Sequence, residues 1–164
     1  MVTVRPAAAG DAEAIAAIYN EGIEDRVATF ETRLRTPAEI AESLAGPLPC
    51  LVADDDGVVL GFARVTPYSD RCVYDGVGEH GVYVARAARG EGIGRLLLDE
   101  VCRAAEAAGL HKLTSRIFSD NAASIAAHEA AGFVVVGVQR RHGRLDGEWR
   151  DCVVVERLLG DAAR

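Results

Sequence analysis

Several classes of protein are excluded by what this sequence lacks. No apolar run approaches the roughly 18 residues that a transmembrane helix needs. The first residues show no basic segment followed by an apolar one, the pattern of a secretion signal, so a cytoplasmic location is expected. The formal net charge is −7, from 18 basic and 25 acidic residues, whereas nucleic-acid-binding domains usually carry a basic face. We therefore expect neither a membrane nor a nucleic acid as a partner.

Metal and disulfide motifs are also missing. The cysteines are far apart, and no Cys-x-x-Cys spacing indicates a zinc site or a redox pair. Each lies among apolar residues and is expected to be a free, buried thiol: Cys50, Cys72, Cys102 and Cys152. The acidic triplet 54–56 precedes Gly57, and an Asp-Gly pair favours a solvated hairpin turn over a metal site. We expect no metal cofactor.

The chain has enough apolar sequence for one domain over residues 1–164, since 49% of its 164 residues are hydrophobic. Periodicity and turn residues predict strands at 2–5, 50–53, 58–65, 79–84, 112–118, 133–138 and 151–155, and helices at 12–23, 37–45, 93–108 and 122–131. Residues 140–150 are expected to form a polar turn. The central strand–helix–strand unit implies a parallel pair with a right-handed crossover. The predicted fold class is α/β (α+β), a mixed sheet of six to seven strands flanked by about four helices.

Side-chain caps mark the starts of the first two helices. Asp11 follows Gly10 and is expected to cap the first helix. Thr36 precedes Pro37, and Glu39 completes a capping box at the start of the second. Both patterns supply acceptors for N–H groups that have no partner inside the first turn.

The most informative stretch joins a strand ending at Val84, a glycine loop and a helix from Ile93. First-turn N–H groups have no partner inside a helix, and the helix dipole adds positive potential, so such a junction binds anions. Glycines let the backbone approach a phosphate, and arginines add charge: Gly90, Gly92, Gly94, Arg89 and Arg95. No Gly-Lys-Ser/Thr follows, which excludes a Walker loop, and the glycines are closer together than in a Rossmann fingerprint.

Arg89, Gly92 and Gly94 match the pattern Arg-x-x-Gly-x-Gly. This pattern resembles the pyrophosphate loop of the GCN5-related N-acetyltransferase (GNAT) superfamily, which holds acetyl-CoA. An ordinary glycine-rich loop before a helix is the alternative. Four further segments resemble the phosphinothricin N-acetyltransferase branch of that superfamily: residues 18–20 with 28–31, 71–75 with 79–84, 121–133, and 147–151.

This resemblance covers essentially the whole chain. It implies a GNAT fold and acetylation of the α-amine of an amino-acid analogue such as phosphinothricin, methionine sulfone, methionine sulfoximine or arsinothricin. It also implies acetyl-CoA as co-substrate and a homodimer.

The resemblance assigns the cofactor contacts to the strand, the loop and one amide. It places the pantetheine arm along Val82, Tyr83 and Val84, where backbone N–H groups freed by a splay or a bulge can also bond the oxyanion. The pyrophosphate is expected on the loop: Arg89, Gly90, Glu91, Gly92, Ile93, Gly94 and Arg95. Asn121 resembles the amide that contacts CoA, and it also fits a helix N-cap.

Acetyl transfer requires a neutral amine, because an ammonium group has no lone pair. The resemblance places the general base at Glu79, and the alternative is an exposed strand carboxylate. Where the wider superfamily often has tyrosine, this chain has His128, as the phosphinothricin branch does. His128 is either the acid that protonates the CoA thiolate or a partly buried structural histidine.

The acceptor's carboxylate and its phosphinate, sulfone or arsinate oxygens favour a cationic partner. Arg71 fits, because a guanidinium fork matches such groups. Residues near Arg71 and the base complete the expected acceptor site, with two aromatic residues as walls or as core: Ser69, Asp70, Glu79, His80, Gly81, Phe30 and Tyr74. Trp149 is expected at a subunit interface or at the pocket edge. His142 is expected on the surface, without a role.

Two other functions stay open. A non-catalytic acyl-CoA-binding module would lack the base or the pyrophosphate loop, and this chain carries candidates for both. An acetyltransferase of protein N-termini would need a more open acceptor groove. The 71–79 loop and the 19–31 segment favour the small-molecule branch by resemblance.

Overall fold

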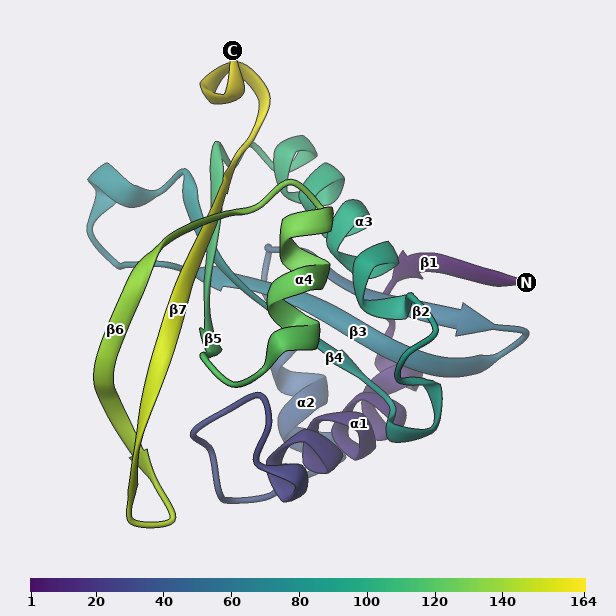
Figure 1. The fold of residues 1–164 in the computed structure, drawn as a ribbon. Coiled ribbons are helices and arrows are strands. Elements are labelled where there is room, and N and C mark those ends of the chain that lie inside the picture. Colours follow the sequence, from purple (N-terminus) through teal and green to yellow (C-terminus); the bar gives the residue numbers. More distant parts are fainter.

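A seven-stranded mixed sheet forms the centre of the computed structural model, which describes residues 1–164 (Figure 1). The strands lie in the order β1-β2-β3-β4-β5-β7-β6, and only β4 and β5 run parallel. The strands are β1 (Val2–Pro6), β2 (Cys50–Asp55), β3 (Val58–Pro67), β4 (Val77–Val84), β5 (Lys112–Phe118), β6 (Val134–Leu145) and β7 (Glu148–Leu158). The helices are α1 (Ala12–Asp25), α2 (Pro37–Ser43), α3 (Ile93–Ala107) and α4 (Ala122–Ala130), with 3-10 turns η1 (Ala9–Asp11), η2 (Cys72–Tyr74), η3 (Arg86–Ala88) and η4 (Gly160–Ala163). The predicted element order and fold class are confirmed.

The two faces of the sheet carry separate cores. On one face, Leu97 and Val101 of α3 pack with Ala53 of β2, and α4 joins the edge of this cluster. On the other face, Ile15 of α1 packs with Val52 of β2, and α2 completes the layer. Neighbouring residues of β2 divide between the two clusters because successive side chains of a strand point to opposite faces.

The polar turn predicted at 140–150 is wrong, because the chain there forms a long hairpin. β6 continues to Leu145 and β7 begins at Glu148. The hairpin extends beyond the sheet, as the lower left of Figure 1 shows, and most of its side chains are solvated. Apolar alternation, the usual signal of a strand, is therefore absent. Trp149 is half exposed, and the Arg144 guanidinium lies 4.2 Å from its ring centre.

The capping box at the second helix is confirmed, since Thr36 accepts the Glu39 N–H and the Glu39 carboxylate accepts the Thr36 N–H.

The cysteines agree with expectation only in part. Cys102 and Cys152 are buried, whereas Cys50 is half-buried and Cys72 is exposed in η2, outside the sheet. All the cysteines are free, and no group of three or more His, Cys, Asp or Glu side chains is arranged to hold a metal ion. None of the helices combines the length and apolar character needed to cross a bilayer.

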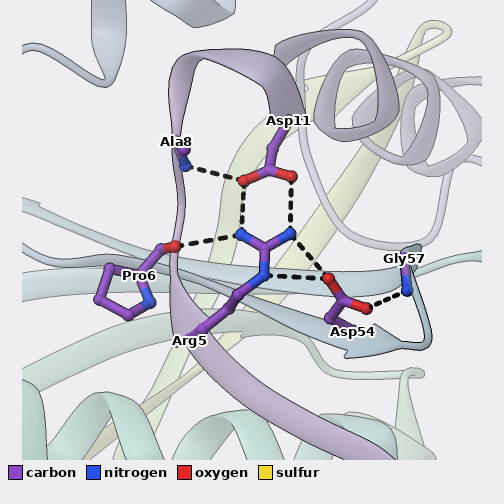
Figure 2. Close-up of polar contacts among 6 residues, drawn as sticks. All are labelled: Arg5, Pro6, Ala8, Asp11, Asp54 and Gly57. Atoms are coloured by element: carbon purple, nitrogen blue, oxygen red, sulfur yellow. Dashed lines mark hydrogen bonds and ion pairs between the residues drawn. The ribbon is translucent and has the colours of Figure 1, made fainter.

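Arg5 joins β1, β2 and the start of α1 through two buried carboxylates (Figure 2). Its guanidinium donates to both oxygens of Asp11, at 2.8 and 2.9 Å, and twice to Asp54, at 2.7 and 2.9 Å. The predicted side-chain cap at Asp11 is therefore wrong, because this carboxylate accepts from Arg5 and from the Ala8 N–H instead. The solvated tip predicted for Asp54 is also wrong, since this residue is 8% exposed. Hydrogen bonds from Arg5 hold the pKa of both carboxyls below the usual range.

The parallel strands β4 and β5 separate soon after they begin (Figure 1). Only three residue pairs join them, the last being Glu79 with Thr114. The Ser115 hydroxyl then donates to the His80 carbonyl at 2.9 Å, and no further pair follows. This separation opens the middle of the sheet and positions the candidate site.

Candidate active site

A cavity of about 1110 Å³ lies where β4 and β5 separate. Its walls come from the segment after α1, the second half of β4, the loop before α3, the end of β5, α4 and the β6–β7 hairpin. The residues predicted to bind the cofactor all line it except Glu91, which is exposed on the loop.

β4 presents unpaired backbone groups to this cavity. The Ala85 N–H donates to Leu60 of β3, so the odd-numbered residues of β4 bond to β3. The even-numbered residues therefore face β5, as the bond at the His80 carbonyl shows. Because β5 has diverged, the N–H groups of Val82 and Val84 face the cavity without a strand partner. The β3–β4 register is continuous, so the splay, and not a bulge, frees these groups.

The loop before α3 has the geometry of an anion site. Gly90 and Gly92 both have φ of +81°, a left-handed conformation that favours glycine, and Gly92 is the N-cap of α3. The Leu96 N–H donates to the Gly92 carbonyl, so the amides before Leu96 have no partner inside the helix. Arg89 and Arg95 line the cavity beside these amides. Such a turn binds phosphate groups.

Arg89 is held in place by α1. Its guanidinium donates to the Asp25 carboxylate at 2.8 Å, and Arg86 donates to the same carboxylate at 2.9 Å. The hydrogen bonds from Arg86 and Arg89 keep the pKa of Asp25 below its usual range. Because Asp25 ends α1, these contacts fix the loop against that helix. Sequence reasoning did not identify Asp25, since it lies more than sixty residues before its partners.

Asn121 acts as the predicted cap of α4. Its Oδ1 accepts the Ser124 N–H at 3.2 Å. Its Nδ2 donates to the Val27 carbonyl at 3.1 Å, which ties α4 to the segment after α1. Asn121 also lines the cavity, and its contact with CoA stays a prediction.

Glu79 and Arg116 meet on one side of the cavity. Glu79 pairs with Thr114 across the sheet, and Arg116 lies two residues further along β5, so their side chains share one face. Tyr83 shares this face and packs against the α1 cluster. The Arg116 guanidinium lies 3.8 Å from the Glu79 carboxylate, and the side chains are 46% and 37% exposed respectively. Sequence reasoning missed Arg116, because strand alternation alone does not show which strand becomes its neighbour.

The opposite face holds a buried histidine pair. His80 and His128 are 4% and 3% exposed, and their Nε2 atoms lie 3.0 Å apart. The His128 Nδ1 lies 2.7 Å from the Ser124 carbonyl, which can only accept, so we assign the His128 proton to Nδ1. The Nε2 of His128 then accepts the Nε2 proton of His80, and the His80 Nδ1 has no partner.

Burial lowers the pKa of both histidines, and the neighbouring His128 lowers that of His80 further. Both rings are therefore neutral near pH 7. Burial thus opposes the protonated state in which His128 would act as an acid. The expectation of a buried structural histidine fits its surroundings, which include Phe133 with its ring centre 5.2 Å away.

The segment 26–35, between α1 and α2, forms the apolar wall. Asn20 of α1 holds this segment: its Nδ2 donates to the Arg35 carbonyl at 3.0 Å, and its Oδ1 accepts the Arg35 N–H at 2.8 Å. Phe30 lines the cavity and meets Phe118 edge-on, with 4.9 Å between ring centres. Phe30 therefore forms a wall of the cavity and also packs in a small core cluster.

Four residues predicted for the acceptor lie outside the cavity. Ser69, Asp70, Arg71 and Tyr74 belong to the β3–β4 connection, at the upper left of Figure 1. Arg71 is exposed, and its guanidinium lies 5.7 Å from the ring centre of Tyr74. They are near Glu79 in sequence, but the connection turns away from the sheet at η2.

The remaining predicted residues divide between the cavity and the surface. His80 and Gly81 line the cavity, whereas Trp149 does not. His142 also lines it, although the sequence indicated a surface residue without a role. Its place depends on the hairpin, which the sequence did not predict.

Comparison with known proteins agrees with this architecture. Residues 15–133 match the Acetyltransferase (GNAT) family. The chain is 38% identical to phosphinothricin N-acetyltransferase of Alcaligenes faecalis, over 96% of this chain and 82% of that one. It is 35% identical to L-methionine sulfoximine/L-methionine sulfone acetyltransferase of Salmonella typhimurium, over 99% and 97% of the two chains. A phosphinothricin acetyltransferase from Sinorhizobium meliloti, solved with acetyl-CoA, matches with a TM-score of 0.92 and 34% identity over 98% and 89% of the two chains. The chain therefore belongs to the acetyltransferase (GNAT) family.

Proposed function

We propose that this protein transfers an acetyl group from acetyl-CoA to the α-amine of a small amino-acid analogue of the phosphinothricin, methionine sulfone, methionine sulfoximine or arsinothricin type. One observation carries the proposal: a single cavity joins the free backbone groups of β4, the N-terminus of α3 and the Glu79 carboxylate. The relatives named for acetylating phosphinothricin and methionine sulfone support this acceptor class.

The residues of the cavity fit acetyl-CoA at both ends. The first-turn amides of α3, with Arg89 and Arg95, would hold the pyrophosphate. Gly90 and Gly92 leave open space where a side chain would stand, so a phosphate can reach the backbone there. The Val82 carbonyl and the Val84 N–H, which have no strand partner, would pair with the amides of the pantetheine arm, as an added strand does.

Glu79 is the proposed general base. It takes a proton from the acceptor's ammonium group, directly or through a water, and the neutral amine then attacks the acetyl carbonyl. The Val82 N–H faces the cavity and would donate to the oxyanion that forms. The new C–N bond gives a tetrahedral intermediate, which collapses as the C–S bond breaks. The nitrogen then releases its second proton to solvent and the departing thiolate takes one up, so the products are the neutral amide and the CoA thiol. His128 stays a candidate for supplying that proton, although its burial lowers its pKa and so opposes the protonated form.

The state of Cys152, the cysteine that lines the cavity, supports direct transfer without an acyl-enzyme. Burial raises the pKa of its thiol. A thiol that stays protonated is a poor nucleophile, so an attack by the acceptor amine is the simpler route.

We also propose a homodimer through β6, the edge strand of the sheet. Its outer valines are 47% to 59% exposed: Val134, Val135, Val136 and Val138. An exposed apolar edge strand is a ready pairing site for another chain. Sedimentation velocity should show a dimer for the natural chain and a monomer for Val136→Lys, and a monomeric natural chain would end this part of the proposal.

Thiol release from acetyl-CoA tests the function. Phosphinothricin, methionine sulfone, methionine sulfoximine, an arsenic analogue, the common amino acids and short peptides would be separate acceptors. Rapid release with one or two analogues supports the proposal. Release with peptides alone would move the acceptor to protein N-termini. Binding of acetyl-CoA without release for any acceptor would indicate a non-catalytic module.

A further inference from the structure

We propose that Arg116 binds the α-carboxylate of the acceptor, and that the enzyme selects free α-amino acids for this reason. The inference rests on the proposed function and names the chemical feature that the acceptor must carry. Arg71, the arginine that the sequence suggested for this role, lies outside the cavity.

Arg116 is the cavity arginine whose donors are available on the acceptor side. Arg89 donates to Asp25 at 2.8 Å. Arg95 lies in the first turn of α3, with its guanidinium 3.9 Å from the Asp99 carboxylate. The nearest carboxylate to Arg116 is that of Glu79 at 3.8 Å, which is beyond hydrogen-bond distance. The fork of the Arg116 guanidinium can therefore donate to both oxygens of a carboxylate in a bidentate pair.

The separation of Arg116 and Glu79 suits an α-amino acid. The amine nitrogen and a carboxylate oxygen of such a molecule lie about 3 Å apart, because only two carbon atoms separate them. With the amine at Glu79 and the carboxylate at Arg116, both contacts can reach about 3 Å across the 3.8 Å gap. Glu79 would thus bind the amine, and Arg116 the carboxylate, of the same α-amino acid.

The acceptor's side chain would then lie against an apolar wall. Phe118 follows Arg116 by two residues on the same face of β5, and its ring meets Phe30 edge-on. An acceptor side chain packed on this wall would cover that side of the Arg116 side chain, which is 46% exposed in the free protein, and would strengthen the interaction of its guanidinium with an anion. A peptide N-terminus offers a neutral amide at this position, and a simple amine offers nothing, so both would leave Arg116 without its partner.

Paired acceptors test the inference. Acetylation of methionine sulfone and of its carboxamide would be measured for the natural chain, Arg116→Gln and Arg116→Lys, with Arg71→Gln as the matched control. We expect the natural chain to prefer the carboxylate by about tenfold to a hundredfold in kcat/KM. The measured ratio is kcat/KM for methionine sulfone divided by kcat/KM for its carboxamide. Arg116→Gln should bring this ratio near one, Arg116→Lys should retain part of the preference, and Arg71→Gln should leave the ratio unchanged. The KM for acetyl-CoA should stay within about twofold throughout, which shows that each variant is folded. The ratio is the readout, because any effect of Arg116 on Glu79 acts on both acceptors equally.

Binding separates this inference from the proposed function. Both compounds would also be titrated into the protein loaded with CoA. Arg116-dependent preference for methionine sulfone without any acetyl transfer would support the carboxylate site and overturn the proposed function. Equal affinity and turnover for the two compounds, binding of neither, or loss of the preference in Arg71→Gln would overturn the role of Arg116.

Discussion

The two sides of the cavity are built in different ways. The side proposed for acetyl-CoA comes mainly from one continuous stretch, residues 82–95, and Asn121 adds to it. The acceptor side joins residues from distant parts of the chain: Phe30, Glu79 and Arg116. Anion binding at a helix N-terminus is a property of local backbone, whereas an acceptor pocket depends on which strands become neighbours. A substitution on one side should therefore change the binding of the substrate on that side and leave the binding of the other substrate unchanged.

The largest effect is expected at Glu79, on the acceptor side. Glu79→Gln should lower kcat by about 10²- to 10⁴-fold, because the amide cannot take the proton of the ammonium group. The dissociation constant of acetyl-CoA should change by less than about twofold. Glu91→Gln, which removes an exposed carboxylate outside the cavity, is the control and should keep full activity. Undiminished turnover in Glu79→Gln would remove this residue as the base.

A smaller effect, on the opposite side, is expected at Arg89. Arg89→Gln should raise the KM for acetyl-CoA by about tenfold and leave the acceptor KM unchanged, because one charge-assisted bond to the pyrophosphate is lost. Asp25→Asn should give a weaker change in the same direction, since Arg89 keeps its charge but loses its 2.8 Å partner. Steady-state kinetics with each substrate varied in turn measures both. A larger change in the acceptor KM would show that the two sides are not separate.

The buried pair of His80 and His128 should have a still smaller effect, which would appear in the pH dependence of kcat. A protonated His128 acting as an acid would make kcat fall as the pH rises through its pKa. Burial lowers that pKa, so His128 is already neutral above its ordinary value of about 6.5. We expect kcat, at saturating substrates, to show no fall between about pH 6.5 and pH 8.5. A decline in that range that disappears in His128→Asn would establish the acid.

Arg5 should affect neither side, since neither it nor its two carboxylate partners line the cavity. Arg5→Met should lower Tm by about 5 °C, because it leaves two carboxylates without their partner, and both KM values should stay unchanged. The pKa values of Asp11 and Asp54 are lower in the folded chain than in the unfolded one. Their contribution to stability is therefore present above about pH 4 and is lost as the pH falls below it. Denaturant titrations at pH 7 and pH 3 should show the difference between Arg5→Met and the natural chain shrinking in acid.

Much of the fold could be predicted from local pattern. The predicted elements other than the hairpin strands have ends within two residues of the observed ones, because apolar period, glycine and capping residues act within a few positions. The hairpin 140–150 was missed because its side chains are solvated and show no period. The prediction for Asp54 is wrong because its partner, Arg5, comes from another strand. The prediction for Asp11 is wrong because Arg5, six residues earlier, takes the carboxylate that was expected to cap α1.

By itself, the sequence determined the order of strands and helices, the glycine loop before α3 and the placement of Glu79 on the strand leading into it. These depend on backbone conformation and on side chains a few residues apart. Only the tertiary structure decided that β4 and β5 separate after Glu79, that Arg116 comes within 3.8 Å of this carboxylate, and that Arg71 lies outside the cavity. It also buried His80 beside His128. The physical reason is that register and burial arise from contacts between segments far apart in the chain, which no local pattern records.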